Sequence, residues 1–343
     1  MSALCLESPT GALECAVQVL KTWRRAPSFK LDAADITRRM VRDALRVEER
    51  SQHDVAQRLV RDTVLKDPVC SKFPPPRGVD RRFCKEILKV LESGYTDDVD
   101  DELYSLCVEG ISCTEDHDVF EGHCALDISQ GSVVLRVSSN LGFPLETGGR
   151  LWPGGCALFG LCAGGFLDDL FQGHVLELGA GTGVVGLGLA CRGAPVTRVT
   201  MTDAREAVVD NLRHNTTATA MSCPMVPCES SVLAWGEPLP SFGEVDVIVG
   251  SELTYDETGH LPLARTLREL LKPIGTARVA VLAAVVRGGE CFESFVSTLC
   301  SQELCWRQVP LGTDAQAVAS SWTCFSSIDP YAMDVRLLHV TAS

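Results

Sequence analysis

Acidic side chains lie at the ends of three apolar runs, each of which has the composition of a buried strand. Glu177 lies in HVLEL, Asp203 closes RVTMTD, and Glu252 closes VDVIVGSE, with Tyr255 three positions later. In an open α/β sheet the carboxyl ends of neighbouring strands border one crevice, and ligands bind in that crevice. The pattern therefore predicts a single site that combines carboxylates with a phenol.

A glycine-rich turn follows the first of these strands. The segment HVLELGAGTGVVGLGLA (174–190) has the pattern of a strand, a tight turn and a helix. Glycine adopts positive φ without steric cost and lets a ligand approach the backbone closely. We therefore expect a cofactor to bind at Gly179, Ala180, Gly181 and Gly183, the alternative being a glycine turn that binds nothing.

The residues around the turn favour S-adenosylmethionine over a nicotinamide dinucleotide. A glycine register that ends at Gly186 matches the dinucleotide fingerprint GxGxxG, which is a weak signal alone. Gly179, however, follows the strand directly, and the carboxylate of Glu177 suits an ammonium group better than a pyrophosphate. Asp203, 20 residues beyond Gly183, suits the ribose hydroxyls of either cofactor or, alternatively, caps the following helix.

Glu252 and Tyr255 suit the methylation of an amine. A lysine with a pKa near 10.4 is almost fully protonated at pH 7, so its neutral form costs about 4–5 kcal/mol. Desolvation and the charge of a sulfonium remove the proton, whereas a carboxylate opposes its loss. We therefore interpret Glu252 as an anchor that aligns the cationic side chain and Tyr255 as a π face for it. A helix-capping or solvated acid and a core tyrosine are the structural alternatives.

The elements that position these residues alternate between strands and helices after Pro144. Seven runs have strand character, namely HVLELG, RVTMTD, PMVPCE, VDVIVGSE, ARVAVLAAVV, ELCWRQVP and DVRLLHVT. Their alternation with helical stretches predicts a doubly wound α/β sheet with helices on both faces. Little helical sequence separates the last two runs, so we expect an antiparallel pair at one edge of the sheet.

The amino-terminal part has a different character, and we place the boundary at about residue 142. Apolar residues recur at helical spacing over 32–92, interrupted by the proline-rich segment 66–78. The segment 81–94 predicts a helix that ends at Gly94, and 125–140 predicts two short strands around a turn. Residues 1–141 are therefore expected to form a mainly helical accessory region, and 142–343 the domain that carries the chemistry.

The composition is that of a globular protein without a membrane span. The 343 residues are 45% hydrophobic and 22% charged, and the net charge of −14 disfavours direct contact with nucleic acid. We find no signal peptide and no apolar run long enough to cross a bilayer. The 16 cysteines are expected to be reduced thiols, and their spacing does not indicate a metal site.

Together these motifs resemble the family 16 protein methyltransferases, a seven-strand class that mostly methylates lysine. The matching segments are ELGAGTG, the acid that ends the second strand, and GSELTY after the fourth strand. The resemblance implies that TGGRLWPGG places Trp152 beside the cofactor, that LAW places Trp235 there, and that Ser251 contacts it too. Ala234 stands where the family usually has an acid, so the contact with the adenine amino group is expected to differ.

The rest of the chain is similar to the elongation factor 2 lysine methyltransferases. The resemblance rests on LVRDTVLKDPVCSKFPPP, RRFCKEIL and DDELYSL in the amino-terminal part and on DPYAMDVRLLHV near the end. It implies a cytoplasmic, monomeric enzyme that methylates one lysine of elongation factor 2, with the amino-terminal part recognising the substrate. The alternatives are a lysine of another protein, a nicotinamide-dependent oxidoreductase, and a non-catalytic module that binds the cofactor.

Overall fold

The computed structural model describes most of the chain and divides it into two compact units. The described residues are 9–25, 33–45, 52–93, 98–112, 121–138, 146–271, 277–286, 289–323 and 334–343. The first unit is Met1–Asp127 and the second is Ile128–Ser343. The domain boundary predicted at residue 142 lies outside the described residues and stays a prediction, and the helix end predicted at Gly94 lies outside them as well.

The first unit is mainly helical, as the periodicity of its sequence predicts. Its helices are α1 (Pro9–Arg25), α2 (Ala33–Leu45), α3 (His53–Leu59), the π-helix η3 (Val60–Leu65), α4 (Pro68–Lys72), α5 (Arg77–Leu91) and α6 (Asp101–Ser112). Their apolar faces share one core that includes Leu20, Val60, Phe83 and Leu103. The helical accessory region expected from the sequence is therefore present.

The proline-rich segment ends one helix and begins another. Pro68 is the first residue of α4, where the missing amide proton of proline does no harm. The side chain of Asp67 caps the same helix by accepting a hydrogen bond from the amide of Val69. A short helix therefore forms inside a segment that the sequence marks only as a break.

A seven-stranded sheet forms the centre of the second unit. Its strands are β3 (Gly173–Leu178), β4 (Val196–Asp203), β5 (Cys228–Val232), β6 (Val247–Ser251), β7 (Val279–Val286), β8 (Leu304–Gln308) and β9 (Asp334–Ala342). Their order in the sheet is β5-β4-β3-β6-β7-β9-β8, with the first five parallel. The doubly wound seven-strand fold predicted from the sequence is confirmed. The order reverses between β3 and β6, which is where such sheets bind ligands.

The edge of the sheet confirms the predicted antiparallel pair and adds a helix. β9 is antiparallel to both β7 and β8. The sequence predicts little helix between β8 and β9, but α12 (Thr313–Trp322) lies there. This helix was missed because its residues, TDAQAVASSW, are small and polar and carry a weak apolar stripe.

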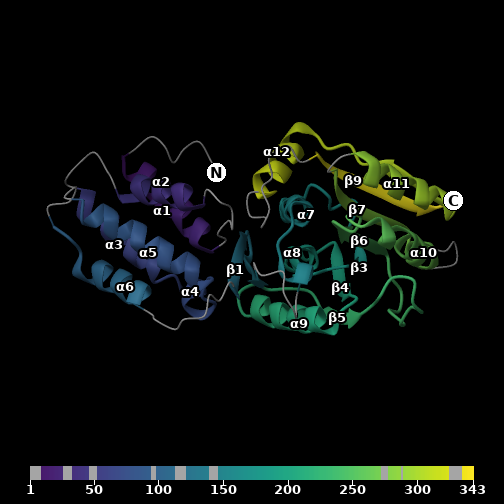
Figure 1. Ribbon diagram of the computed structural model, residues 1–343, viewed down its shortest axis with the longest axis horizontal. Helices are drawn as coiled ribbons and strands as arrows, with labels where there is room; N and C mark the ends of the chain where they lie inside the picture. The colour runs from purple at the N-terminus through teal and green to yellow at the C-terminus, as the bar shows by residue number, and fades with distance from the viewer. Residues whose placement is uncertain are drawn as a thin grey trace. The chain divides into compact units, whose positions relative to one another are not determined.

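Helices cover both faces of this sheet (Figure 1). They are α7 (Pro153–Ala163), α8 (Val184–Arg192), α9 (Glu206–Ala220), α10 (His260–Leu270) and α11 (Gly289–Ser301), with the 3-10 turns η4 (Glu146–Gly149) and η5 (Glu257–Gly259). Leu176, Ile248 and Leu282 share one core with residues of α10 and α11. Because strand side chains alternate, Glu177 faces the opposite side, towards α8.

The strands predicted in 125–140 are present as β1 (Glu121–Ile128) and β2 (Gly131–Ser138). Within the second unit, β2 is held to α9 by side-chain hydrogen bonds. The Thr219 hydroxyl bonds both backbone groups of Val134, and the Asn215 side chain accepts from the amide of Arg136. These contacts fix β2 beside the helix that follows Asp203.

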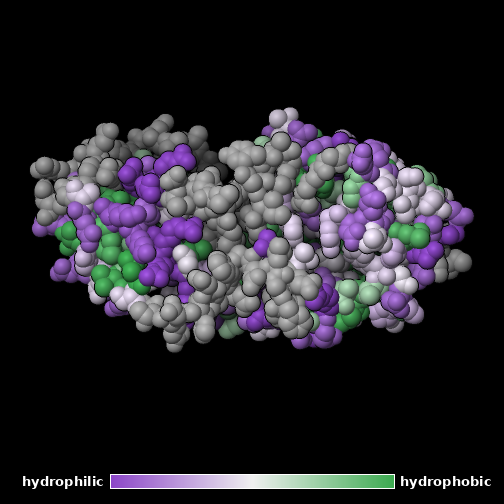
Figure 2. All heavy atoms as spheres, in the orientation of Figure 1, coloured by the Kyte–Doolittle hydropathy of each residue, from purple (hydrophilic) through white to green (hydrophobic). Residues whose placement is uncertain are grey.

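No helix in the described part of the chain is long and apolar enough to cross a bilayer. Figure 2 shows a mixture of hydrophilic, intermediate and a few hydrophobic side chains on the visible face of the second unit, and an area of hydrophobic side chains bordered by hydrophilic ones on the first.

Candidate active site

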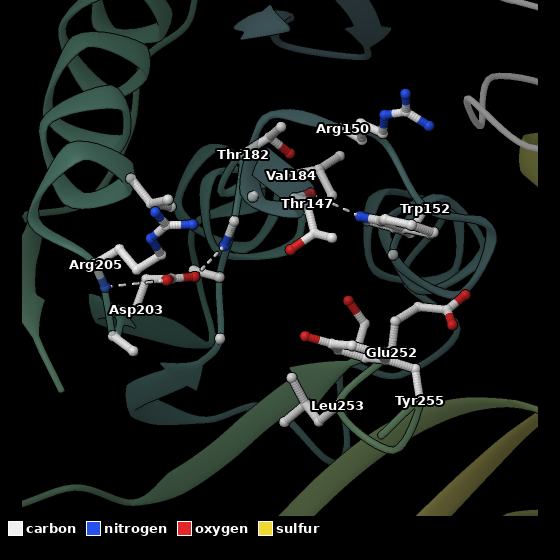
Figure 3. Close-up of a pocket in the computed structure, with 18 of the residues that line it drawn as sticks. Thr147, Arg150, Trp152, Thr182, Val184, Asp203, Arg205, Glu252, Leu253 and Tyr255 are labelled. Carbon is white, nitrogen blue, oxygen red and sulfur yellow. Dashed lines mark hydrogen bonds between the residues drawn. The ribbon is translucent and has the colours of Figure 1, made fainter. Parts of the chain in front are cut away.

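A cavity of about 590 Å³ lies at the carboxyl ends of β3, β4 and β6, where the strand order reverses. Nine of the eleven predicted site residues line it, namely Trp152, Gly179, Ala180, Gly181, Asp203, Trp235, Ser251, Glu252 and Tyr255. Figure 3 shows Asp203 on one side of the cavity and Trp152, Glu252 and Tyr255 on the other. The sequence therefore predicted which residues meet, although Glu177 and Gly183 do not line the cavity.

The glycine turn closes one side of the cavity and needs its glycines. Gly179, Gly181 and Gly183 all have positive φ, at 58°, 55° and 78°. A Cβ at Gly179 would lie 2.6 Å from the Leu253 side chain, and one at Gly183 would lie 2.7 Å from Leu212. Packing therefore requires glycine at Gly179 and Gly183, and Gly179 and Gly181 line the cavity.

Asp203 is fixed by the turn that it faces. One carboxylate oxygen accepts a hydrogen bond from the Gly181 amide at 3.1 Å, and the other accepts from the Arg205 amide at 3.4 Å. Burial raises the pKa of Asp203 above its ordinary value, and the two amide hydrogen bonds act in the opposite direction. The side chain is therefore held in one orientation at the cavity wall, as a hydrogen-bond acceptor for ribose hydroxyls requires.

Glu177 lies behind the turn instead of in the cavity. Its side chain is buried, with the residue 1% exposed, and one carboxylate oxygen accepts from the Gly186 amide at 2.9 Å. A Cβ at Gly186 would overlap that oxygen. Burial raises the pKa of Glu177 to about 8. The third glycine of the apparent dinucleotide fingerprint thus makes room for a carboxylate. Contact between Glu177 and a cofactor ammonium stays a prediction.

Glu252 has a strained backbone and a carboxylate placed at a helix start. Its φ is 58°, a left-handed conformation that is unfavourable for a residue with a Cβ. The residue is 8% exposed, and its carboxylate accepts from the Gly154 amide at 2.9 Å, in the first turn of α7. The positive end of a helix favours a negative charge there. The helical turn after the loop is capped by Asp256 instead, through the Thr258 amide.

The aromatic residues lie at three places around the cavity. Tyr255 is 64% exposed and lines the cavity, so it is not a core residue. The Trp152 indole nitrogen donates to the Thr147 carbonyl at 3.0 Å, which ties the start of α7 to η4. Trp235 lies over the glycine turn, where a Cβ at Gly179 would be 3.2 Å from its ring. Each ring therefore borders the site from a different segment.

Several cavity residues were missed at the sequence level. They are Thr147, Gly148, Arg150, Gly155, Thr182, Ala204, Val184, Arg205, Val208, Leu253 and Pro262. Four of them, Thr182, Val184, Ala204 and Leu253, are direct neighbours of predicted residues, so proximity to a motif was the available signal for these. Arg205 follows Asp203 by two positions, and Arg150 precedes Trp152 by two. Ala234 does not line the cavity, and Asp203 and Glu252 are the acids among its described lining residues.

Comparison with known families decides between the cofactor classes. Residues 134–301 match the model of a family described as lysine methyltransferase, a segment that contains β3, β4 and β6 with the whole cavity. Through this segment the chain belongs to the lysine methyltransferase family. This lysine methyltransferase uses S-adenosylmethionine, and the nicotinamide-dependent oxidoreductase alternative is wrong.

Individual relatives differ in how much of the chain they cover. EEF1A lysine methyltransferase 3 of Mus musculus is 32% identical over 160 residues, which span 46% of this chain and 66% of the mouse protein. Protein-lysine N-methyltransferase EEF2KMT of Bos taurus is 26% identical over 332 residues, spanning 83% of this chain and 93% of the bovine protein. Magnesium protoporphyrin IX methyltransferase from Synechocystis PCC 6803, solved with bound SAH, has a TM-score of 0.37 and 14% identity, covering 55% of this chain and 84% of that protein.

Proposed function

We propose that this lysine methyltransferase methylates a lysine of elongation factor 2. The observation that supports this substrate is the extent of the similarity to bovine EEF2KMT, which reaches across 83% of the chain and beyond the family segment 134–301. The mouse EEF1A methyltransferase is more identical but aligns with only 46% of the chain. A lysine of elongation factor 1A is therefore the second candidate, and it is favoured by identity alone.

The glycine turn and Asp203 are proposed to hold the cofactor. The backbone at Gly179 and Gly181 has no side chain to block a ligand, and Asp203 presents hydrogen-bond acceptors at the adjoining wall. Trp152, Trp235 and Ser251 border the same space. When bound, S-adenosylmethionine supplies a methyl group on a positively charged sulfur. This set fits a nucleoside with a cationic end, because its acceptors and apolar rings lie in one cavity.

Glu252 and Tyr255 are proposed to hold the target amine across the cavity. Glu252 lines the cavity, and the hydrogen bond from the Gly154 amide stabilises a negative charge on its carboxylate. A carboxylate favours the ammonium form, so Glu252 captures and orients the side chain, and desolvation drives the loss of the proton to water. The bound cofactor would supply the methyl group, and the neutral amine held by Glu252 would be its acceptor. The exposed ring of Tyr255 offers a π face to the methylated ammonium.

The proposed substrate is tested with the two elongation factors side by side. Elongation factors 2 and 1A, purified from cells that lack this protein, are incubated with it and labelled S-adenosylmethionine, and the products are mapped by mass spectrometry. Label on one lysine of elongation factor 2 and none on elongation factor 1A is the expected result. Label on elongation factor 1A alone would show that elongation factor 1A, and not elongation factor 2, is the substrate. Cofactor binding without label on any protein would favour a non-catalytic module.

The remaining sequence predictions concern the context of the enzyme. We propose that the helical first unit recognises the substrate and that the enzyme works as a cytoplasmic monomer. The similarity to EEF2KMT supports the first proposal, because it includes residues of that unit. Cell fractionation and light scattering of the purified chain test the other two, and a nuclear protein or a stable dimer would contradict them.

A further inference from the structure

A buried polar cluster lies directly beneath the loop that carries Glu252 and Tyr255. The carbonyl of Thr254, between these two residues, accepts a hydrogen bond from the thiol of Cys291 at 2.8 Å. The same carbonyl lies 3.2 Å from the Nε2 atom of His260. One backbone oxygen therefore meets two side chains, one from the start of α10 and one from α11.

His260 is held on both of its other sides. Its Nδ1 atom lies 3.4 Å from the hydroxyl of Ser294, and its ring packs edge-on against Phe295 with a centroid distance of 5.3 Å. The residue is 2% exposed. With Nε2 directed at the Thr254 carbonyl, Nδ1 is directed at the Ser294 hydroxyl, which can donate or accept. The contacts thus hold the ring in one orientation.

The Thr254 carbonyl is the last of three points at which the loop is fixed. The Glu252 amide donates to the Ala283 carbonyl of β7 at 2.8 Å, despite its left-handed φ. Leu253 follows, and its side chain packs beneath Gly179 and Gly250. Beyond Thr254, Tyr255 is exposed, so the direction of its ring depends on the peptide that precedes it.

We propose that His260 and Cys291 are positioning residues for methyl transfer, acting through the Thr254 carbonyl to hold Tyr255 at the cavity. The inference rests on the proposed function of Glu252 and Tyr255 in gripping the amine. Neither His260 nor Cys291 lines the cavity, so both act from behind the loop. Their effect is on alignment, to which transfer rates respond steeply.

The test uses matched cysteine variants of the full chain. Cys291→Ala removes the thiol donor, Cys291→Ser replaces it with a hydroxyl donor, and Cys300→Ala makes the same change at an exposed position of α11. His260→Phe keeps an aromatic ring against Phe295 but removes the donor. We expect Cys291→Ala and His260→Phe to lower kcat/KM for the protein substrate by about tenfold, with S-adenosylhomocysteine affinity within about twofold. Cys291→Ser recovers most of the loss, and Cys300→Ala behaves as wild type.

Hydrogen exchange separates this inference from the substrate assignment. The Glu252 and Thr258 amides are hydrogen-bonded in this loop, so their exchange reports its opening. Cys291→Ala is expected to speed their exchange at least about fivefold, and Cys291→Ser to slow it again. Unchanged exchange, or a matching loss of cofactor affinity, would overturn the positioning role. Faster exchange in Cys291→Ala, combined with a wild-type enzyme that labels another protein and not elongation factor 2, would overturn the proposed substrate and leave the positioning role standing.

Discussion

At the scale of single residues, Glu252 combines a backbone strain with a charge at a helix start. Its carboxylate accepts a hydrogen bond from the Gly154 amide, and the residue lines the cavity. Glu252→Gln keeps an acceptor of the same shape but removes the charge, so we expect kcat/KM for the protein substrate to fall about 10–100-fold with little change in stability. Glu252→Ala also leaves the Gly154 amide without this acceptor and should lower the free energy of unfolding by about 1–2 kcal/mol. Steady-state kinetics and urea unfolding measure both, and full activity in Glu252→Gln would exclude the charge as the anchor.

Glu177 is expected to make the free energy of unfolding depend on pH. Burial raises its pKa to about 8 in the folded protein, against about 4.3 in an unfolded chain. Between these values the folded state holds a proton that the unfolded state has lost, so stability falls as the pH rises, by up to about 1.4 kcal/mol per pH unit. Glu177→Gln should flatten this decline. Urea unfolding without cofactor at several pH values measures it, with Glu237→Gln, an exposed acid, as the control; parallel curves for Glu177→Gln and wild type would contradict the raised pKa.

The three acids Asp203, Glu252 and Glu177 show which side-chain positions a sequence can predict and which it cannot. Asp203 ends β4 and Glu252 directly follows β6, so the sheet places both at the same edge whatever their neighbours are. Glu177 lies one residue inside β3, where side chains alternate between the faces. Leu176 and Leu178 take the side of α10 and α11, which turns Glu177 towards α8. The alternation of side chains along β3 can be predicted from the sequence. Which face of the sheet is covered by the start of α8 is known only from the packing.

At the scale of elements, α7 connects the active site to the edge of the sheet. Its first turn binds Glu252, and further along Gly160 lies against Trp322 of α12. A Cβ at Gly160 would overlap the indole ring, which also packs on Phe159 with a centroid distance of 4.9 Å. Gly160→Ala should therefore lower the free energy of unfolding by about 1–3 kcal/mol, as overpacked cores do.

A glycine at the start of α12 provides the control for the Gly160→Ala prediction. Gly312 precedes α12, has ordinary φ, and would place a Cβ with nothing within 4 Å. Urea unfolding should show Gly312→Ala within about 0.5 kcal/mol of wild type. Equal stability of Gly160→Ala and Gly312→Ala would mean that α12 does not pack tightly on α7.

The helices and strands also differ in how well they can be predicted from the sequence. Four of the five parallel strands were predictable because they are largely apolar runs, as in VAVLAAVV of β7. The fifth, β5, is the polar segment CESSV, and the expected run PMVPCE overlaps it only at Cys228 and Glu229. The helix α12 was not, because it is stabilised by the placement of Ala315, Ala319 and Trp322 against other elements instead of by its own pattern. Helix α4 likewise depends on the cap from Asp67, which the proline-rich sequence obscures.

At the scale of the whole molecule, the charge of −14 favours a partner with positive surface charge around its target lysine. Such attraction speeds encounter and is screened by salt. We expect kcat/KM for the protein substrate to fall several-fold when NaCl is raised from about 50 to 300 mM, with a smaller change in kcat. Initial rates at fixed cofactor saturation measure this. Salt-independent kcat/KM would show that the acidic surface takes no part in recognition.

The most direct measurement of the central claim is a crystal structure of the full chain soaked with S-adenosylhomocysteine. Asp203 should accept hydrogen bonds from the ribose hydroxyls beside Gly179 and Gly181, with the sulfur directed towards Glu252 and Tyr255. Density for the nucleoside elsewhere, or a sulfur directed away from Glu252, would contradict the assignment of this cavity to methyl transfer.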